Sequence, residues 1–362
     1  MFSIPYLLRN VLTAACAVAV LSPQAARAAD IGALAQPAVL STKSVQAAML
    51  AIARAGARLV AVGERGVILL SDDDGKSWRQ APAPVRTSLT AVQFVDARNG
   101  WAVGHMGVVL HSADAGRSWR KQLDGVAIAR IYQQAVRAGA DSAQARDEQG
   151  YASMLSEDGP DKPLLALDFR DARHGLVVGA YNMALQTSDG GVTWEPFSQR
   201  LPNPRRLHLY KVMQRDQRVV LVGEQGLMLS SGNGGRDYSA LASPYKGSWF
   251  GILAGRDGAW LAYGLRGSAW RSADQGATWS SLATGVNGSI SAALAMADGR
   301  ELLASQTGEL LLTADGGQHF ERVGTALAAP VAEVAQAADG ALVAATLRGP
   351  VRIPLNSSVV KR

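Results

Sequence analysis

Six copies of one short phrase carry the carboxylates that first suggest chemistry in this chain. Four copies match the pattern Ser/Thr-x-Asp-x-Gly-x-Ser/Thr-Trp, and two others, which we call worn, depart from it at some positions. Carboxylates repeated at one spacing could act as general acids and bases, or as ligands for calcium. The third positions of the six copies are Asp73, Asp114, Asp189, Asn233, Asp274 and Asp315.

The same phrase also has a mechanical interpretation. Asp, Ser and Thr side chains hydrogen-bond to nearby backbone N–H groups and so fix a turn, and the glycine supplies a residue with positive φ. The closing aromatic residue can then pack between neighbouring units of a repeat. On this interpretation the carboxylates are structural and bind no metal. The aromatic residues expected in the core are Trp78, Trp119, Trp194 and Trp279.

Sialidases and other glycoside hydrolases contain this phrase, so an enzyme is the main alternative. Such an enzyme needs two facing carboxylates, or a Tyr nucleophile with a carboxylate partner, and a sialidase also needs clustered arginines. Glu64 and Glu224 are expected on one face but three repeats apart. Sialidases have an Arg-Ile-Pro motif before their first phrase, whereas here Arg352-Ile353-Pro354 follows the last one. The histidines have no metal-ligand spacing. We predict no catalytic residue and no cofactor, with a sialidase-like hydrolase or a glycan-binding protein as the alternative.

The spacing of the phrase predicts the elements that must hold it. Successive copies begin 41, 75, 44, 41 and 41 residues apart. A period in the low forties, with four short strands per unit, is typical of the blades of a β-propeller. The second strand and its tight turn recur seven times, first at Leu59–Gly66 and last at Ala341–Gly349. We therefore predict an all-β, seven-bladed propeller of four-stranded antiparallel blades over residues 30–362. The seventh unit lacks the phrase, so Ala38–Ser41 is expected to supply its outer strand and close the ring.

The 75-residue gap holds an insertion over residues 124–162, between the second and third blades. Ile128, Tyr132 and Val136 lie at helical spacing, and Gly139 interrupts the pattern, so we predict a helical hairpin. Propeller topology puts this hairpin on the same face as the turns between second and third strands. Long insertions are often functional, and a tolerated surface insertion is the open alternative.

The variable residues of those turns are candidates for contact with a partner, because they differ within a repeated frame. Arginine, histidine and tyrosine side chains around one end of the propeller channel would suit a carboxylate-rich or phosphate-bearing surface. The alternative is that these residues have no role beyond forming the turns. The candidate partner-binding residues, with one from the insertion, are Arg65, His105, Tyr181, Arg266, Arg348 and Tyr132.

Residues 1–29 have the features of a cleaved export signal. Arg9 precedes an apolar run over residues 11–21, and Ala26-Arg27-Ala28 fits a cleavage site. The only cysteine, Cys16, lies inside this signal, so the mature chain is expected to lack disulfides and thiolate metal sites. We expect a periplasmic protein, with an extracellular location as the alternative.

Charge bears on the kind of partner. The formal net charge of +6 at pH 7 makes the chain mildly basic. Its lysines and arginines are scattered and do not alternate with aromatic residues, so nucleic acid is not the predicted partner. We expect a protein partner and a chain that is monomeric by itself.

A longer composite unit resembles a known family. Asp96–Trp119 reads Asp-x-x-x-Gly-Trp-Ala-Val-Gly-x-x-Gly and then runs into the Asp phrase, and Asp171–Trp194 repeats this more loosely. The unit closely resembles the photosystem II stability/assembly factor family of seven-bladed propellers, over about Ser44 to Leu355 apart from the insertion. The resemblance implies a non-enzymatic, exported factor that docks on a membrane protein complex. The client stays open, and a periplasmic accessory of a membrane transporter is a further alternative.

Overall fold

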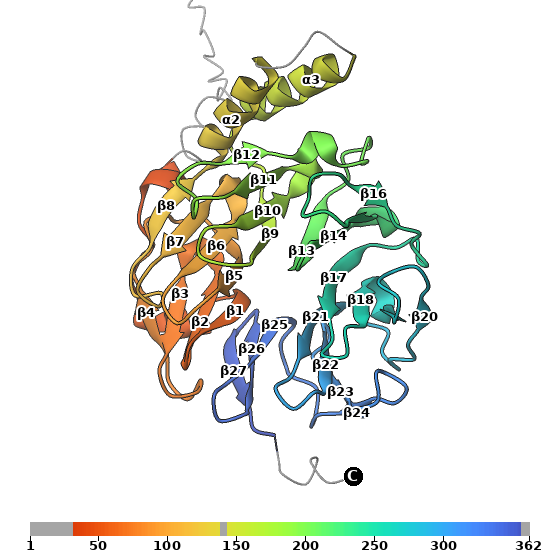
Figure 1. Cartoon of the computed structure of the whole chain (residues 1–362). Coiled ribbons are helices and arrows are strands. Elements are labelled where there is room, and N and C mark those ends of the chain that lie inside the picture. Colours follow the sequence, from red (N-terminus) through yellow and green to blue (C-terminus); the bar gives the residue numbers. More distant parts are fainter. Residues whose placement is uncertain (1–31, 138–142, 356–362) are drawn as a thin grey trace, which may run out of the picture.

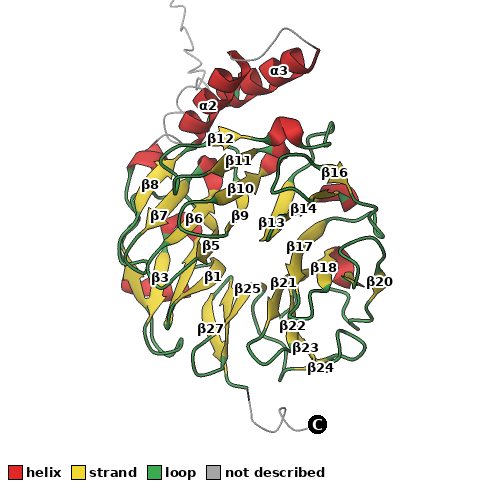
Figure 2. Ribbon diagram, viewed as in Figure 1, coloured by secondary structure: helices red, strands yellow, loops and turns green. Residues whose placement is uncertain are grey.

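The computed structural model describes residues 32–137 and 143–355, which form seven antiparallel sheets around one axis (Figure 1). The innermost strands of neighbouring sheets contact one another around the whole ring, and the last contact joins β25 (Val331–Gln336) to β1 (Met49–Ala55). The predicted seven-bladed propeller is confirmed. Strands and short turns make up the ring, and the two long helices lie outside it (Figure 2).

The blades follow one another in chain order, and the strands of each blade run from the axis outward. The strands of blades 1 to 3 are β1 (Met49–Ala55), β2 (Arg58–Gly63), β3 (Ile68–Ser71), β4 (Arg79–Ala81), β5 (Leu89–Phe94), β6 (Gly100–Gly104), β7 (Val109–Ser112), β8 (Arg120–Leu123), β9 (Leu164–Phe169), β10 (Gly175–Gly179), β11 (Ala184–Thr187) and β12 (Glu195–Pro196). Those of blades 4 to 7 are β13 (Leu209–Arg215), β14 (Arg218–Gly223), β15 (Met228–Ser231), β16 (Ser239–Ala240), β17 (Trp249–Ala254), β18 (Trp260–Gly264), β19 (Ala269–Ser272), β20 (Ser280–Ser281), β21 (Ile290–Ala295), β22 (Glu301–Ser305), β23 (Leu310–Thr313), β24 (Glu321–Arg322), β25 (Val331–Gln336), β26 (Leu342–Thr346) and β27 (Gly349–Ile353).

The seventh blade has three strands instead of the expected four, and β27 is its outermost strand. The N-terminal segment Ala38–Ser41, expected to complete this blade, lies against blade 1. The N–H of Ala38 donates to the carbonyl oxygen of Ala83 (3.0 Å). The side-chain amide of Gln80 both donates to and accepts from the backbone of the segment. The prediction for this segment is wrong because Gln80, in β4, offers that backbone a donor and an acceptor.

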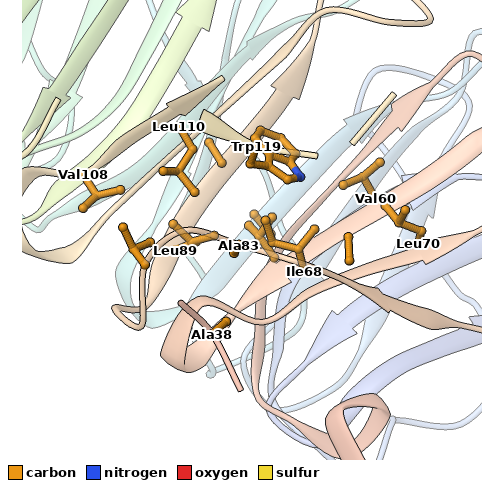
Figure 3. Close-up of a cluster of buried hydrophobic side chains, with 14 of the residues drawn as sticks. Ala38, Val60, Ile68, Leu70, Ala83, Leu89, Val108, Leu110 and Trp119 are labelled. Carbon is orange, nitrogen blue, oxygen red and sulfur yellow. The ribbon is translucent and has the colours of Figure 1, made fainter. Parts of the chain in front are cut away.

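The core lies between the blades. The second strands β6 and β10 are buried over their whole length. Between blades 1 and 2, Val60, Ile68 and Leu110 pack with Trp119 in one cluster (Figure 3). The indole N–H of Trp119 donates to the carbonyl oxygen of Gly116 (3.0 Å), and the side chain is 8% exposed. The aromatic residue that ends this phrase therefore lies wedged between two blades.

The insertion contains two helices, α2 (Gly125–Arg137) and α3 (Ala143–Glu157), which pack against each other. The carboxylate of Asp124 accepts a hydrogen bond from the N–H of Ala127 (3.0 Å) and so satisfies the first turn of α2. The apolar stripe of α2, which includes Tyr132, is buried against blades 2 and 3. The helices are thus tightly attached to the ring.

The predicted export signal of residues 1–29, with Cys16, lies outside the described residues. Within residues 32–137 and 143–355, no helix is long and apolar enough to span a bilayer.

Candidate functional site

One face of the propeller carries the turns between second and third strands together with the insertion, and we call it the turn face. Helix α2 contacts the turn of blade 2 directly, so the insertion lies on this face. In blades 1 to 5 the turns are short 3₁₀ segments: η2 (Glu64–Gly66), η3 (His105–Gly107), η4 (Ala180–Asn182), η6 (Glu224–Gly226) and η7 (Leu265–Gly267).

The backbone of these turns is fixed, and this positions their side chains. The first N–H of each turn donates to a carbonyl next to the innermost strand, as Glu64 does to Ala48 (2.9 Å). The middle residue has left-handed backbone angles, with φ of 51° at Arg65, 55° at Tyr181 and 56° at Arg266. A non-glycine residue there costs about 1–3 kcal/mol, and such strain is often kept at functional sites. Strained residues that face solvent therefore support the choice of these turns as candidates.

Three of the predicted residues are arginines exposed on the turn face. Arg65, Arg266 and Arg348 come from blades 1, 5 and 7. Among the residues that the structure describes, their guanidinium groups have no ion-pair partner, whereas Arg58 is paired with Asp72 (2.5 Å). Unpaired guanidinium groups at a surface are available to carboxylates or phosphates.

The other three candidates lie in different environments. His105 is exposed in η3, and Tyr181 is 42% exposed in η4. Tyr132 is buried, at 1% exposure. Its hydroxyl donates to the carbonyl oxygen of Ala184 and accepts from the N–H of the same residue, both at 3.1 Å. Burial raises the pKa of Tyr132 to about 12. Tyr132 anchors α2 to blade 3, and the structure does not place it on a partner-binding surface.

Sequence reasoning missed a row of aromatic rings that leads from Tyr181 to the central channel. Ring centroids lie 4.8 Å apart between Tyr181 and His208, and 6.3 Å apart between His208 and Tyr210. Phe250 follows at 5.8 Å from Tyr210. The N–H of His208 donates to the carboxylate of Glu224 (2.8 Å), which ties the row to η6. We call these four rings the aromatic row.

All seven innermost strands share an irregularity that forms the mouth of the channel. In each strand the pairing with the second strand shifts by one residue, so one extra residue bulges out. These residues line a central cavity of about 680 Å³. They recur 40 to 45 residues apart, except for the 75 residues across the insertion, and this period could have revealed them in the sequence. None of them is charged: they are Leu50, Thr90, Leu165, Tyr210, Phe250, Ser291 and Ala332.

Three carboxylates line the cavity, and two of them, Asp168 and Glu333, belong to innermost strands. Asp168 accepts hydrogen bonds from the backbone N–H of Gln214 (2.6 Å) and from the side chain of Gln93 (3.2 Å). Glu333 is the second carboxylate, and desolvation raises the pKa of both groups. Because Gln93, Asp168 and Gln214 belong to β5, β9 and β13, these bonds connect three neighbouring blades. Asp168 therefore has a structural task.

The groups of a sialidase-type site lie at opposite ends of the cavity. The hydroxyl of Tyr210 donates to the carboxylate of Glu224 (3.4 Å), which gives a tyrosine–carboxylate pair at the mouth. Arg170 and Arg215 also line the cavity, but they stand where β9 and β13 end. Tyr210 and Arg215 are five positions apart along an extended strand, which corresponds to about 17 Å. The tyrosine–carboxylate pair and the arginines that a sialidase requires together are therefore apart in this cavity.

The Asp phrases form turns on the face opposite the turn face. Asp189 accepts hydrogen bonds from the hydroxyl of Thr193 (2.6 Å) and from the N–H groups of Thr193 (2.9 Å) and Val192 (3.0 Å). These bonds, led by that of the Thr193 hydroxyl, lower the pKa of Asp189 to about 2. Over the described ranges, no three His, Cys, Asp or Glu side chains gather in a way that could hold a metal ion.

Comparison with protein families decides which family this propeller represents. The family described as photosynthesis system II assembly factor YCF48 matches residues 38–128 and 156–340. The chain belongs to this family. The unmatched residues between the two segments, 129–155, lie within the helical insertion, so the family model does not cover most of α2 and α3.

Individual relatives agree with the YCF48 family. The photosystem II assembly lipoprotein Ycf48 of Synechococcus sp. (strain CC9902) is 32% identical over 77 residues, which span 21% of this chain and 23% of the lipoprotein. A solved structure of YCF48 bound to D1 peptide matches with a TM-score of 0.64 at 14% identity, over 89% of this chain and 97% of that one. A streptogramin B lyase matches with a TM-score of 0.65 at 12% identity, over 86% and 95%. At these identities the structural matches show a shared fold, which serves both a peptide-bound protein and an enzyme.

Proposed function

We propose that this protein is an exported, non-enzymatic propeller that binds a protein partner and serves the assembly or stability of a membrane protein complex. Membership of the YCF48 family over most of the ring carries this proposal. A relative with the same fold is known with a bound D1 peptide, which supports a protein client. Photosystem II is therefore the first complex to test. The lipoprotein character of the Synechococcus relative supports export, and we place this protein in the periplasm.

The turn face is the surface that we assign to the client. It combines the unpaired arginines, the aromatic row and the insertion. Carboxylates of the client would bind the guanidinium groups, and its apolar side chains would pack on the rings, since aromatic residues and arginine are enriched at protein interfaces. On the opposite face the Asp phrases use their oxygens within their own turns.

A pair of triple charge reversals tests this assignment. The first variant carries Arg65→Glu, Arg266→Glu and Arg348→Glu on the turn face. The control carries Lys76→Glu, Arg117→Glu and Arg236→Glu, three exposed positions in the Asp phrases of the opposite face. Both change the net charge equally. We expect the first variant to abolish pull-down of the client identified by crosslinking in native cells, and the control to retain it. Undiminished pull-down by the first variant would contradict the assignment.

An activity screen tests the non-enzymatic part of the proposal. Purified protein is incubated with chromogenic glycosides that represent common glycan linkages. We expect no more product than from protein carrying Tyr210→Phe and Glu224→Gln, which removes the tyrosine–carboxylate pair at the mouth. Turnover that this double variant loses would favour a glycoside hydrolase instead.

A further inference from the structure

Blade 7 is the only blade in the described part of the chain without a fourth strand. The fourth strands of the other blades are short, from two residues in β24 to four in β8. Each of them covers the outer edge of a third strand. In blade 7 the third strand is β27, which is the outermost strand of the blue blade in Figure 1. Because no strand of the described ranges pairs with it, we call the outer edge of β27 the open edge.

The pairing of β27 shows which backbone groups face outward. Pro350 stands opposite Ala345, and Arg352 stands opposite Val343. In antiparallel strands, opposed residues alternate between pairs that exchange hydrogen bonds and pairs that do not. Pro350 has no N–H, so its pair is of the second kind, and so is the pair of Arg352 two residues later. The carbonyl of Pro350 and both backbone groups of Arg352 thus point away from β26, and no backbone group in the described ranges bonds to them.

The N-terminal part of the ring covers only the start of this edge. Residues Ala38–Ser41 are held by blade 1, as described above. The following turn, η1 (Thr42–Gln46), contacts β27 at its first residue, where a Cβ on Gly349 would overlap the carbonyl oxygen of Val45. Beyond Gly349, no backbone group of residues 32–137 or 143–355 bonds to the outward groups of Pro350 and Arg352.

The surroundings of the edge are apolar and basic. Two of the six large apolar side chains that are exposed in the described residues lie at the start of β27, and two more lie on the N-terminal segment along the outer edge of blade 1. Leu347 (46% exposed) precedes β27, and Val45 (37%) lies beside Gly349. The other two are Val39 and Leu40, on the segment that crosses β4. Two exposed cations, Arg348 and Lys43, stand at the same end of β27.

We propose that the open edge of β27 binds an extended segment of the client, which adds as the fourth strand of blade 7. Strand addition of this kind gains affinity from backbone hydrogen bonds and specificity from alternate side chains. Two to four residues suffice, because that is the length of the outer strands elsewhere in the ring. The segment has apolar side chains that cover Leu347 and Val45, and an acidic group at the end next to Arg348. This inference rests on the proposed function, since it requires a protein client.

Two substitutions at Arg352 distinguish the contribution of its backbone N–H to client binding from that of its side chain. Arg352→Pro and Arg352→Ala both remove the guanidinium group, which pairs with Asp339 and donates to the carbonyl oxygen of Asp74. Only Arg352→Pro also removes the outward N–H. That N–H has no partner in β26, and edge strands tolerate proline where the N–H faces outward, so we expect similar thermal unfolding of the two variants.

The test places the photocrosslinker benzoylphenylalanine at Leu347 or Pro354, which flank the edge, or at Arg266 in blade 5, in native cells. We expect one protein to be captured from all three positions. Capture from both flanking positions should be about two- to tenfold lower in Arg352→Pro than in Arg352→Ala, the effect of one hydrogen bond. If Arg352→Pro does not fold, hydrogen exchange at the wild-type Arg352 amide replaces it: slowing by the captured protein supports the proposal, and unchanged exchange overturns it.

The other outcomes distinguish this inference from the proposed function. Equal capture by the two Arg352 variants overturns strand addition. Capture from Arg266 alone also overturns it and leaves the proposed function standing. Crosslinks to a second copy of the chain, or to residues 356–362 of the same chain, would show that the chain itself occupies the edge. Capture of no protein from any position would overturn both proposals.

Discussion

Asp189 illustrates how single residues of the Asp phrases work, because its oxygens bond within its own turn. The worn phrase of blade 4 shows what this position requires. Oδ1 of Asn233 accepts hydrogen bonds from the N–H groups of Arg236 and Asp237, both at 3.1 Å. An acceptor oxygen therefore suffices, and a negative charge is not needed to form the turn. A carboxylate that is engaged in this way is poorly placed for catalysis.

The first prediction compares two substitutions at Asp189. Asp189→Ala removes the acceptor of both N–H groups and of the Thr193 hydroxyl, and we expect it to lower the free energy of unfolding by about 1–3 kcal/mol. Asp189→Asn keeps one acceptor, as Asn233 does, and should cost less than about 1 kcal/mol. Urea denaturation followed by circular dichroism measures both. Equal losses for the two variants would show that charge, and not hydrogen bonding, sets the role of this residue.

The second prediction concerns acid stability. Hydrogen bonds, first those from the hydroxyls of Ser77, Thr193 and Thr278, lower the pKa of Asp73, Asp189 and Asp274 to about 2. The unfolded value is about 3.9, so protonation is harder in the folded state. The resulting stability is complete above about pH 4 and is lost as the pH falls towards 2.

The measurement is the melting temperature between pH 2.5 and 6. We expect the wild-type value to fall steeply below pH 4. A variant with asparagine at all three positions cannot titrate there and should have a flatter profile. Parallel profiles for the two proteins would rule out these carboxylates as the acid-sensitive groups.

The helical insertion shows how one element depends on a few anchors. Its two helices are attached to the ring through the buried stripe of α2, in which Tyr132 bonds to both backbone groups of Ala184. Ala184 begins β11, the third strand of blade 3. The phenol thus holds the insertion beside the turn face and satisfies a strand end that the insertion buries. An element fixed in this way can present its outer surface to a client in one orientation.

The third prediction tests this anchor with Tyr132→Phe. Loss of the hydroxyl leaves the buried N–H of Ala184 without this partner, whereas the carbonyl of Ala184 keeps the N–H of Phe197 (3.0 Å). The unsatisfied N–H should cost about 1–3 kcal/mol. Hydrogen exchange in α2 and α3 should become faster. The control is Tyr245→Phe, which removes a partly buried hydroxyl that donates to Leu265 (3.2 Å) and lies in another part of the ring. If both variants change exchange in the helices equally, Tyr132 is not a specific anchor.

At the scale of the whole molecule, the ring could be predicted from the sequence. Each copy of the phrase predicts the same local turn, and the spacing of the repeats gives the number of blades. Features that depend on contacts across the ring could not. The location of Ala38–Ser41 depends on Gln80. The aromatic row depends on the bulges of β13 and β17, which bring Tyr210 and Phe250 into line with Tyr181 of η4. The helical spacing that predicted α2 also implied a buried stripe, and Tyr132 should have been assigned to it. The sequence thus predicted which turns carry the candidate residues, but not whether each candidate side chain is buried or exposed.

The junction between blades 7 and 1, which closes the ring, differs from the other junctions between neighbouring blades. Neighbouring blades elsewhere are joined by the chain, but blades 7 and 1 are not. Their innermost strands β25 and β1 are in contact. On the opposite face the side chain of Asp74, in the phrase of blade 1, accepts a hydrogen bond from the N–H of Ala338 (2.9 Å), and its carbonyl oxygen accepts one from Arg352 (2.9 Å). No strand of blade 1 is shared with blade 7 in the described residues. This junction is therefore expected to be the weakest in the ring.

The fourth prediction is that the ring opens first between blades 7 and 1. Native-state hydrogen exchange should show lower free energies of opening for β25 to β27 than for β13 to β15, because the chain does not connect blades 7 and 1 and local opening can begin there. Asp74→Ala removes the acceptor of the Ala338 N–H and should speed exchange in blade 7 while leaving blade 4 unchanged. Asp74→Asn keeps an acceptor oxygen and should restore exchange close to that of the wild type. Uniform acceleration across all seven blades in Asp74→Ala would instead mean that the ring unfolds as one unit, and that the junction is no weaker than the others.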